Sequence, residues 1–467
     1  MDSLKLEMLL KTFRTEFFGT KNEEFLSVST DSRQPLTKGL FFALTGERFD
    51  GHDFVSQAID NGHTGIVIRK DMFEKVKERT GRKIQDVTVF CVPDTLKSLG
   101  DLASAYLLSK KAKRFAITGS CGKTTTKELL ASMLSAGYKV IKTEGNLNNL
   151  IGLPLTAFRV ESDTDFAVLE MGMNAFGEIK RLTEISLPHI AAITNVRPAH
   201  LEGVGSIDGV LKAKWELFEN SPEECICVIN LDDERIKTAS ESLKRKKITC
   251  SLKENADVML TADPVLMSEY TDVRLKITGK TVSVRLPLPG LHNVSNLLVA
   301  SAAAVAAGIS IDEITAGAES VIPVKGRMNI LRFGSTILVD DSYNANPASV
   351  EGALRFLSSL SVSQRIAVLA DMLELGLESS ELHNQIGALV AKLGNIDALV
   401  LFGREISYMK EGAVRAGYPS DRIFMAVSHQ DAVSIVKRLI RGNTAVLIKG
   451  SHSMHMEKVV EELKAIL

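Results

Sequence analysis

Short runs of consecutive apolar residues recur along the middle of the chain, separated by segments with helical spacing. Phe115–Ile117, Phe166–Leu169, Ile190–Ile193 and Ile226–Ile229 each have the length of a strand and contain no polar residue. Such runs are typical of strands covered on both faces, and their alternation with helices indicates a parallel sheet. The pattern therefore predicts an α/β domain with helices on both sides of its sheet.

The same alternation is found before and after this region. Before residue 110, strands are expected at Leu40–Leu44 and Gly65–Ile68, with a helix at Phe54–Asn61 between them. From about Val324 the pattern restarts, and a last helix is expected from Met454 to the end. The five strands expected there are Thr336–Val339, Ile366–Leu369, Ala398–Phe402, Ile423–Ala426 and Ala445–Ile448.

Two further elements are expected near the end of the middle region. Val282–Leu286 alternates in polarity after a Thr-Gly-Lys turn, which predicts a β-hairpin. An Ala-rich segment, Val294–Ala307, predicts a long helix that ends at Gly308, because glycine tolerates the left-handed conformation at a helix C-terminus.

The length of 467 residues leaves room for three domains of roughly 150 residues each. We predict an α/β protein with a small mixed domain over residues 1–110, a central phosphate-loop domain with a parallel sheet over residues 111–323, and a C-terminal Rossmann-like domain over residues 324–467. No internal repeat or long linker interrupts this organisation.

The most informative motif lies between the first central strand and the helical segment that begins near Lys127. A glycine-rich turn between a strand and a helix N-terminus lets backbone N–H groups approach phosphate oxygens, and the helix dipole adds positive potential. Lys123 is expected to reach the outer phosphates of ATP, and the Thr124 hydroxyl to ligate Mg²⁺. The loop is a variant, since it lacks the first glycine of the common pattern and Thr118 precedes the shorter Gly119-x-x-Gly122-Lys123-Thr124. The residues expected around the phosphates are Gly119, Ser120, Cys121, Gly122, Lys123, Thr124 and Thr125.

Composition excludes some classes of function. A net charge of −1 leaves no basic excess for a general nucleic-acid binder. The five cysteines have neither zinc spacing nor a disulfide framework, which suits a reducing compartment. The N-terminus lacks a signal layout, and the longest apolar stretch, near Ala302–Ala307, is far shorter than the roughly 20 residues of a membrane span. We expect a soluble, cytoplasmic protein that binds neither nucleic acid nor membrane.

Several polar residues follow predicted strands, where α/β folds bind ligands. Glu170 can hold Mg²⁺ or simply begin a helix, and His200 can bind a metal or serve a structural purpose. Lys212 and Lys214 would ordinarily be solvated residues of a helix. Arg327 can form a fork onto a phosphate or a surface salt bridge. The segment from Asp340 to Pro347 has two acids, two amides and a proline after a strand, which is typical of a functional loop.

Taken in this order, these motifs resemble those of the Mur ligase family of ATP-dependent amide-bond-forming enzymes, over essentially the whole chain. The resemblance implies that Lys123, Glu170, His200 and Lys214 form the catalytic centre. Glu170 and His200 would bind metal, and Lys214 would become a further ligand by carbamylation. The residues implied to contact the nucleotide base, ribose or phosphates are His292, Asn293, Asn296, Arg327 and Asp341.

Segments of the first domain resemble the UDP-binding domain of some family members. The residues implied to contact the UDP-sugar are Ser32, Arg33, Gly46, Arg48 and His52, of which Arg48 can equally be a solvated loop charge. Other segments resemble the member that adds the final dipeptide, and the Asp-Asn-Pro-Arg sequence of its diaminopimelate-adding relative is absent. The substrate contacts implied by these segments are Asn146, Asn148, Asn149, Tyr343, Asn344, Asn346 and His383.

The resemblance thus implies an enzyme that uses ATP and Mg²⁺ to join D-alanyl-D-alanine to UDP-N-acetylmuramoyl-tripeptide through an acyl phosphate. A monomer working in cytoplasmic peptidoglycan precursor synthesis is expected. The alternatives are a Mur ligase that adds lysine or diaminopimelate, a folylpolyglutamate synthetase, or a peptidoglycan-binding module with a vestigial ATP site. A GTPase switch would carry Asn-Lys-x-Asp and Asp-x-x-Gly, and neither sequence occurs.

Overall fold

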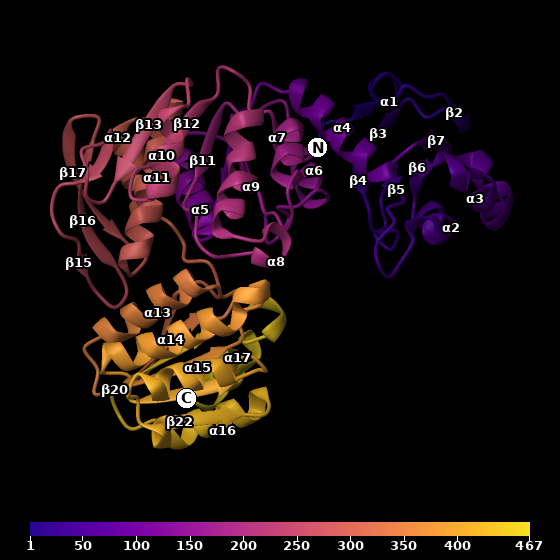
Figure 1. Cartoon of the computed structure of the whole chain (residues 1–467). Coiled ribbons are helices and arrows are strands. Elements are labelled where there is room, and N and C mark those ends of the chain that lie inside the picture. Colours follow the sequence, from indigo (N-terminus) through magenta and orange to yellow (C-terminus); the bar gives the residue numbers. More distant parts are fainter.

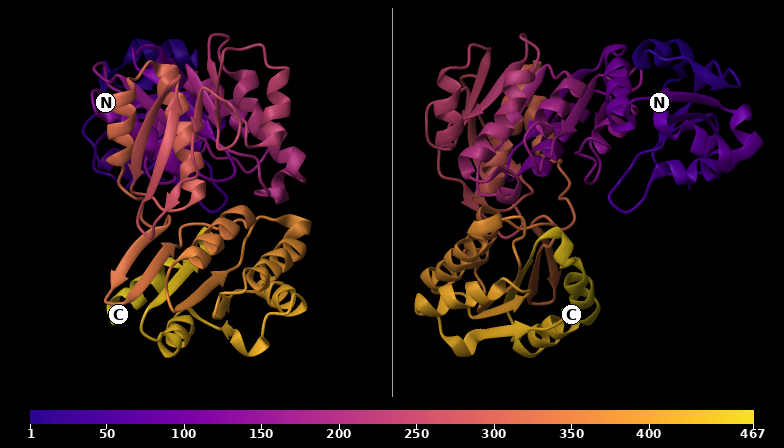
Figure 2. Two further views of the ribbon diagram at one scale, coloured as in Figure 1. Left: turned by 90° about the vertical axis from the view of Figure 1, so that its left-hand side faces the viewer. Right: turned by 45° about the vertical axis from the view of Figure 1, so that its right-hand side comes forward.

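The computed structural model describes all residues from 1 to 467, and the chain forms three units that each have a sheet of their own (Figure 1). The central unit lies between the other two. Figure 2 shows the N-terminal unit attached to one side of the central unit and the C-terminal unit packed against another part of it. No helix has the length and apolar character required to cross a membrane.

The N-terminal unit is built on a five-stranded sheet in the order β2-β7-β6-β5-β4, in which only β2 is antiparallel to its neighbour. A separate pair, β1 and β3, is antiparallel. The strands are β1 (Leu4–Lys5), β2 (Phe17–Gly19), β3 (Glu24–Phe25), β4 (Ser27–Ser29), β5 (Gly39–Phe42), β6 (His63–Arg69) and β7 (Thr88–Val92). The helices are α1 (Leu6–Phe13), α2 (Val55–Asp60), α3 (Phe73–Thr80) and α4 (Thr95–Leu108).

The central unit contains a ten-stranded sheet whose parallel part runs β9-β10-β8-β11-β12-β13-β14. The predicted hairpin is present as β16 and β17, which with β15 form the antiparallel end of this sheet. The strands are β8 (Lys113–Thr118), β9 (Val140–Lys142), β10 (Phe166–Glu170), β11 (Ile190–Ile193), β12 (Ile226–Asn230), β13 (Lys247–Ser251), β14 (Val258–Leu260), β15 (Val265–Leu266), β16 (Thr271–Ile277) and β17 (Lys280–Leu286).

Helices cover both faces of the central sheet, as the fully apolar strands require. On one face α5 and α11 pack together with α12, and on the other α7 packs with α9. The long helix α11 ends at Gly308, whose φ of 86° is left-handed. The helices are α5 (Lys123–Ser135), α6 (Gly152–Ala157), α7 (Glu178–Ser186), α8 (Leu201–Val204), α9 (Ile207–Asn220), α10 (Glu234–Glu241), α11 (Leu291–Ala307) and α12 (Ile311–Glu319).

The C-terminal unit has a six-stranded sheet in the order β18-β19-β23-β20-β21-β22, parallel except for β18. Apolar residues of α13 and α14 pack on one face, and those of α16 and α17 on the other. The strands are β18 (Asn329–Phe333), β19 (Thr336–Asp341), β20 (Gln364–Ala370), β21 (Ala398–Phe402), β22 (Ile423–Ala426) and β23 (Thr444–Lys449). The helices are α13 (Pro347–Ser359), α14 (Ser379–Leu393), α15 (Ile406–Arg415), α16 (His429–Leu439) and α17 (Glu457–Ile466).

Two elements of the C-terminal unit differ from the expectation. The last helix begins at Glu457 instead of Met454, because residues 452–454 form a 3-10 turn and His455 has a left-handed φ of 52°. Strand β18 was not predicted. It is an edge strand whose residues are at least partly exposed, so its sequence has no continuous apolar run.

Candidate active site

The glycine-rich loop joins β8 to the N-terminus of α5. At two of its positions, neighbouring side chains leave no room for any residue larger than glycine. Gly119 has φ 152°, and a side-chain Cβ there would collide with the Thr194 hydroxyl. Gly122 has φ 80°, and a Cβ there would collide with the Asn296 amide. The loop is also fixed by Asn195, whose Oδ1 accepts a hydrogen bond of 3.0 Å from the backbone N–H of Cys121. The sequence therefore builds a narrow, rigid turn at a helix N-terminus, which is a favourable site for an anion.

Lys123 folds back over this loop. Its Nζ donates a hydrogen bond of 2.8 Å to the backbone carbonyl of Gly119. Burial lowers the pKa of the Lys123 amine, and the neighbouring Glu170 carboxylate opposes that shift. The side chain of Lys123 thus lies where the phosphates of a bound triphosphate are expected.

Glu170 stands at the end of β10, in register with Ile117 of β8, and only 2% of it is exposed. Its Oε2 accepts a hydrogen bond of 2.9 Å from the Thr124 hydroxyl. Its Oε1 accepts one of 2.8 Å from the Asn148 side chain. The buried Nζ of Lys127 lies 3.9 Å from the same carboxylate and compensates its charge. The tertiary structure therefore brings Thr124, Asn148 and Glu170 together at the phosphate loop.

These donors suit Mg²⁺, which prefers carboxylate and hydroxyl oxygens and usually keeps ligands from the nucleotide phosphates. The Thr124 hydroxyl and the Glu170 carboxylate are already adjacent, so two hard oxygen donors face the loop. No group of three or more His, Cys, Asp or Glu side chains that could hold a metal ion is present. At the loop the protein offers Thr124 and Glu170 as candidate ligands.

His200 lies on the loop after β11, at the contact with the C-terminal unit. Its Nδ1 is 2.6 Å from Oε2 of Glu374, a short ion-pair contact without the angle of an aligned hydrogen bond. The contact lowers the pKa of the Glu374 carboxyl. Glu374 was not predicted as a site residue.

Lys214 is buried on α9, with 1% of the residue exposed. Burial lowers the pKa of its amine well below the ordinary value, and the positive charge of Lys123 lowers it further. The expectation of a solvated helix face is correct for Lys212, which is exposed with its Nζ 5.7 Å from the ring of Phe176, and wrong for Lys214. A neutral amine next to the phosphate loop is the form that carbamylation requires.

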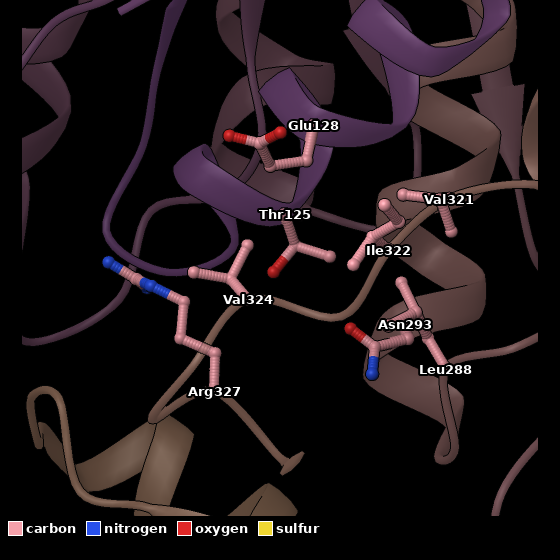
Figure 3. A pocket seen from close by; sticks show the side chains of 8 residues that line it. All are labelled: Thr125, Glu128, Leu288, Asn293, Val321, Ile322, Val324 and Arg327. Atoms are coloured by element: carbon pink, nitrogen blue, oxygen red, sulfur yellow. The ribbon is translucent and has the colours of Figure 1, made fainter. Parts of the chain in front are cut away.

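A small pocket lies beside the loop, at the segment that links the central and C-terminal units (Figure 3). The figure shows Thr125 on one wall and Asn293 and Arg327 on the others. The guanidinium of Arg327 lies 4.2 Å from the centroid of the Tyr343 ring, and its Nε is buried without a partner. The lining residues are Thr125, Glu128, Leu288, Asn293, Val321, Ile322, Val324 and Arg327. Most of the apolar ones lie on a linker without a motif, so sequence reasoning missed them.

The helix that begins next to this pocket holds three of the predicted nucleotide contacts. Asn293 donates a hydrogen bond of 2.8 Å to the backbone carbonyl of Pro289, and Asn296 donates one of 3.2 Å to Asn293. Burial lowers the pKa of His292. Asn296 thus lies against the loop at Gly122, and Asn293 lines the pocket together with Thr125.

The loop after β19 reaches the phosphate loop from the C-terminal unit. Asn346 caps α13 and accepts a hydrogen bond of 3.1 Å from the thiol of Cys121, while its amide donates to the backbone carbonyl of Ser120 at 3.4 Å. Asp341 is paired at 2.5 Å with the buried Lys449, which was not predicted. Lys449 also donates to the backbone carbonyl of the exposed Asn344.

The predicted UDP-sugar contacts lie apart from this centre, on the N-terminal unit. Arg33 is exposed and paired with Asp31, and Gly46 and Arg48 lie on an exposed loop. The Ser32 hydroxyl donates to Gln57 at 2.7 Å.

His52 is buried, with both ring nitrogens engaged within the protein. Its Nδ1 is 2.5 Å from Asp50, and its Nε2 accepts from the backbone of Arg69 at 3.0 Å. The geometry supports a structural role for His52 in place of a ligand contact.

His383 is also buried and engaged. Its Nε2 accepts from the backbone N–H of Met372 at 3.0 Å, and its Nδ1 lies 2.7 Å from the carbonyl of Ser379. The geometry therefore does not support a direct contact with a dipeptide. Of the two remaining amides, Asn149 accepts from the backbone at the start of α6, and Asn146 is exposed.

Three family models match the chain in succession. The Mur ligase family, catalytic domain model covers residues 24–107, the Mur ligase middle domain model covers residues 117–304, and the Mur ligase, glutamate ligase domain model covers residues 326–452. The chain belongs to the Mur ligase family. It is therefore an ATP-dependent ligase.

Relatives match over nearly their whole length. The UDP-N-acetylmuramoyl-tripeptide–D-alanyl-D-alanine ligases of Escherichia coli and Bacillus subtilis are 34% and 33% identical. These alignments cover 94% and 93% of this chain and 93% and 92% of the relatives. Among solved structures, MurF from Acinetobacter baumannii has a TM-score of 0.90 at 30% identity, covering 100% of this chain and 99% of that one. MurF ligase from Thermotoga maritima, in complex with ADP, has a TM-score of 0.81 at 26% identity, covering 94% and 97%.

Proposed function

We propose that this ligase joins D-alanyl-D-alanine to UDP-N-acetylmuramoyl-tripeptide at the expense of ATP, in the synthesis of the peptidoglycan precursor. The observation that carries the proposal is the full-length similarity to relatives named for that reaction, at 34% and 33% identity. The joined network of Thr124, Asn148 and Glu170 beside the phosphate loop supports it, because this arrangement suits activation of a carboxylate by ATP.

The reaction begins with activation, because a carboxylate is a poor acyl donor. The terminal carboxylate of the tripeptide attacks the γ-phosphorus, its bond to the β–γ bridging oxygen breaks, and an acyl phosphate and ADP result. Lys123 and the backbone N–H groups of the loop reduce the repulsion between the two anions as they approach. The amine of D-alanyl-D-alanine then attacks the acyl carbon, loses a proton, and expels inorganic phosphate.

Thr124 and Glu170 would hold Mg²⁺ at the nucleotide, with His200 and a carbamylated Lys214 completing a second position. The ion supplies charge neutralisation at the phosphates when it is bound. The low pKa of the buried Lys214 supports this role, since only the neutral amine reacts with carbon dioxide. Glu170 keeps its orientation through Asn148 and Lys127.

The three units have separate tasks in this proposal. Residues 1–110 hold the UDP end of the substrate, residues 111–323 hold ATP, and residues 324–467 bring Arg327 and Asn346 to the nucleotide and present the dipeptide. The chain is proposed to work as a monomer in the cytoplasm, without nucleic acid or membrane, where ATP and a reducing environment are available. Closure of the units would exclude water from the acyl phosphate.

The test is ADP release by the purified protein with ATP, Mg²⁺ and UDP-N-acetylmuramoyl-tripeptide, with and without D-alanyl-D-alanine. Tripeptides ending in lysine and in diaminopimelate are compared in parallel. Release that depends on both substrates, with a product heavier by the dipeptide less one water, is the expected result. Turnover only with UDP-N-acetylmuramoyl-dipeptide and a diamino acid would instead assign the preceding step and overturn the proposal.

A further inference from the structure

The contact between the central and C-terminal units includes two loop residues with left-handed backbones that face each other. His200 has φ 54° and Glu374 has φ 63°, and their side chains are 2.6 Å apart. Residues other than glycine rarely adopt this conformation, and it persists where the surrounding structure holds it. The pairing of two such residues across a unit boundary indicates that both loops are shaped for this contact.

Backbone contacts flank the pair. The N–H of Glu202 donates to the backbone carbonyl of Glu374 at 3.3 Å. Gly376 lies so close to Glu202 that a Cβ at this glycine would be 3.2 Å from the Glu202 Cα. The two loops are therefore docked along their main chains, and the side-chain contact is more than a chance meeting of two surface charges.

The loop that presents Glu374 is anchored at its first residue. The buried carboxylate of Asp371 accepts three backbone hydrogen bonds of 2.8, 3.0 and 3.1 Å from the N-terminus of α15. These donors belong to Arg404, Glu405 and Ile406.

The next two residues of the loop are held as well. The ring of His383 accepts a hydrogen bond of 3.0 Å from the backbone N–H of Met372. The hydroxyl of Ser451 accepts one of 2.8 Å from the backbone N–H of Leu373. The segment Asp371–Gly376 and His383 thus form a rigid support that presents the Glu374 carboxylate to His200.

We propose that Glu374 is a positioning residue for the metal ligand His200. Its carboxylate contacts the Nδ1 side of the imidazole, so that Nε2 is the ring nitrogen left for a divalent cation. A histidine that ligates a metal commonly donates its other N–H to a carboxylate, which fixes the ring and its tautomer. Because Glu374 belongs to the C-terminal unit, docking of that unit completes the surroundings of a ligand in the central unit.

The exposure of the Glu374 and His200 side chains distinguishes a role in metal binding from a role in stabilising the fold. The Glu374 side chain is 55% exposed and that of His200 is 21% exposed, and ion pairs at such positions contribute little to folding. Removing the carboxylate should therefore change metal binding while leaving the thermal unfolding temperature almost unchanged.

The experiment measures Mn²⁺ binding to the protein–ADP complex by electron paramagnetic resonance of the free ion. Glu374→Ala is expected to weaken Mn²⁺ binding about 10-fold. Glu378→Ala is the matched control, because Glu378 is an exposed glutamate two residues after this segment and has no ion pair, and the Mn²⁺ affinity of this variant should equal that of the wild type. Wild-type affinity in Glu374→Ala would overturn the inference.

A double variant tests whether Glu374 acts through His200. His200→Ala is expected to weaken Mn²⁺ binding, and adding Glu374→Ala should cause no further loss. Additive losses would mean that Glu374 contacts the ion by itself, which contradicts a positioning role. The inference rests on the metal role of His200 in the proposed function. Unchanged affinity in His200→Ala would remove that metal role, whereas a loss in His200→Ala without one in Glu374→Ala would overturn this inference alone.

Discussion

The Thr124 hydroxyl donates a hydrogen bond of 2.9 Å to the Glu170 carboxylate, joining the first turn of α5 to the end of β10 across 46 positions of sequence. This contact places a hydroxyl and a carboxylate, the two oxygen ligands expected for Mg²⁺, next to the residues that surround the phosphates. The Nζ of Lys127, 3.9 Å from Glu170, compensates the charge of this buried carboxylate. The relationship links the nucleotide loop directly to the proposed metal site.

Glu170→Gln should reduce kcat about 100-fold or more. The amide keeps the size of the side chain and an oxygen that can accept from Asn148, but it removes the negative charge that faces the nucleotide metal. Steady-state kinetics with varied Mg²⁺ measure the effect, and thermal unfolding checks that the variant is folded. A kcat within threefold of wild type would contradict the role of Glu170.

Gly122→Ala should lower stability and weaken nucleotide binding. Gly122 and Gly177 both precede helices and have φ of 80° and 84°, so both substitutions carry the left-handed backbone cost of about 1 kcal/mol. Only at Gly122 does a new Cβ also collide with a neighbour, the Asn296 amide. Gly177→Ala is therefore the control. Chemical unfolding and titration with ADP should show a larger loss for Gly122→Ala, and equal losses would refute the steric argument.

Lys214→Ala should abolish ligase activity, and short carboxylates such as acetate or formate should restore part of it. The reason is that the added anion replaces the carboxylate of a carbamylated lysine, whose formation is favoured by the low pKa of the buried amine. Lys212→Ala, on the exposed face of the same helix, should keep its activity and show no response to the anions. An active, unsupplemented Lys214→Ala protein would rule the role out.

Stability should fall as the pH drops from about 6.5 to about 4, in part because of His189. Burial lowers the pKa of this imidazole to about 4, and the positive charge of Arg114 contributes. Its Nδ1 accepts a hydrogen bond of 3.0 Å from the backbone N–H of Arg114, which requires the neutral ring. The folded state therefore binds fewer protons than the unfolded state in this window, so the contribution is complete above pH 6.5 and is lost on acidification.

His189→Asn, whose side-chain oxygen can accept but does not titrate, should show a smaller decrease in unfolding temperature between pH 7 and pH 5. Because His189 is exposed, solvent screening keeps the expected difference to a few degrees. The same decrease in both proteins would show that His189 does not contribute.

Much of the architecture could be predicted from local pattern. The strands at Ile190–Ile193, Ala398–Phe402 and Ile423–Ala426 have the expected bounds, because continuous apolar runs have few alternative conformations in an α/β fold. Strand β18 could not be found in this way, since polar residues interrupt its short sequence and the strand is defined by its pairing with β19. The hydrogen bonds of His52 and His383 were also beyond the pattern, because their backbone donors are brought to the rings only by the folded structure.

The sequence by itself determined the nucleotide site, because a phosphate loop is a local device: glycines, a lysine and a threonine at fixed spacing between a strand and a helix are sufficient to form it. The family motifs along the sequence likewise indicated the class of enzyme. Only the tertiary structure decided that Lys214 is buried while Lys212 is solvated, and that Glu374 meets His200 across a unit boundary. Burial and charge pairing depend on residues far apart in the chain, and no local pattern encodes which of them become neighbours.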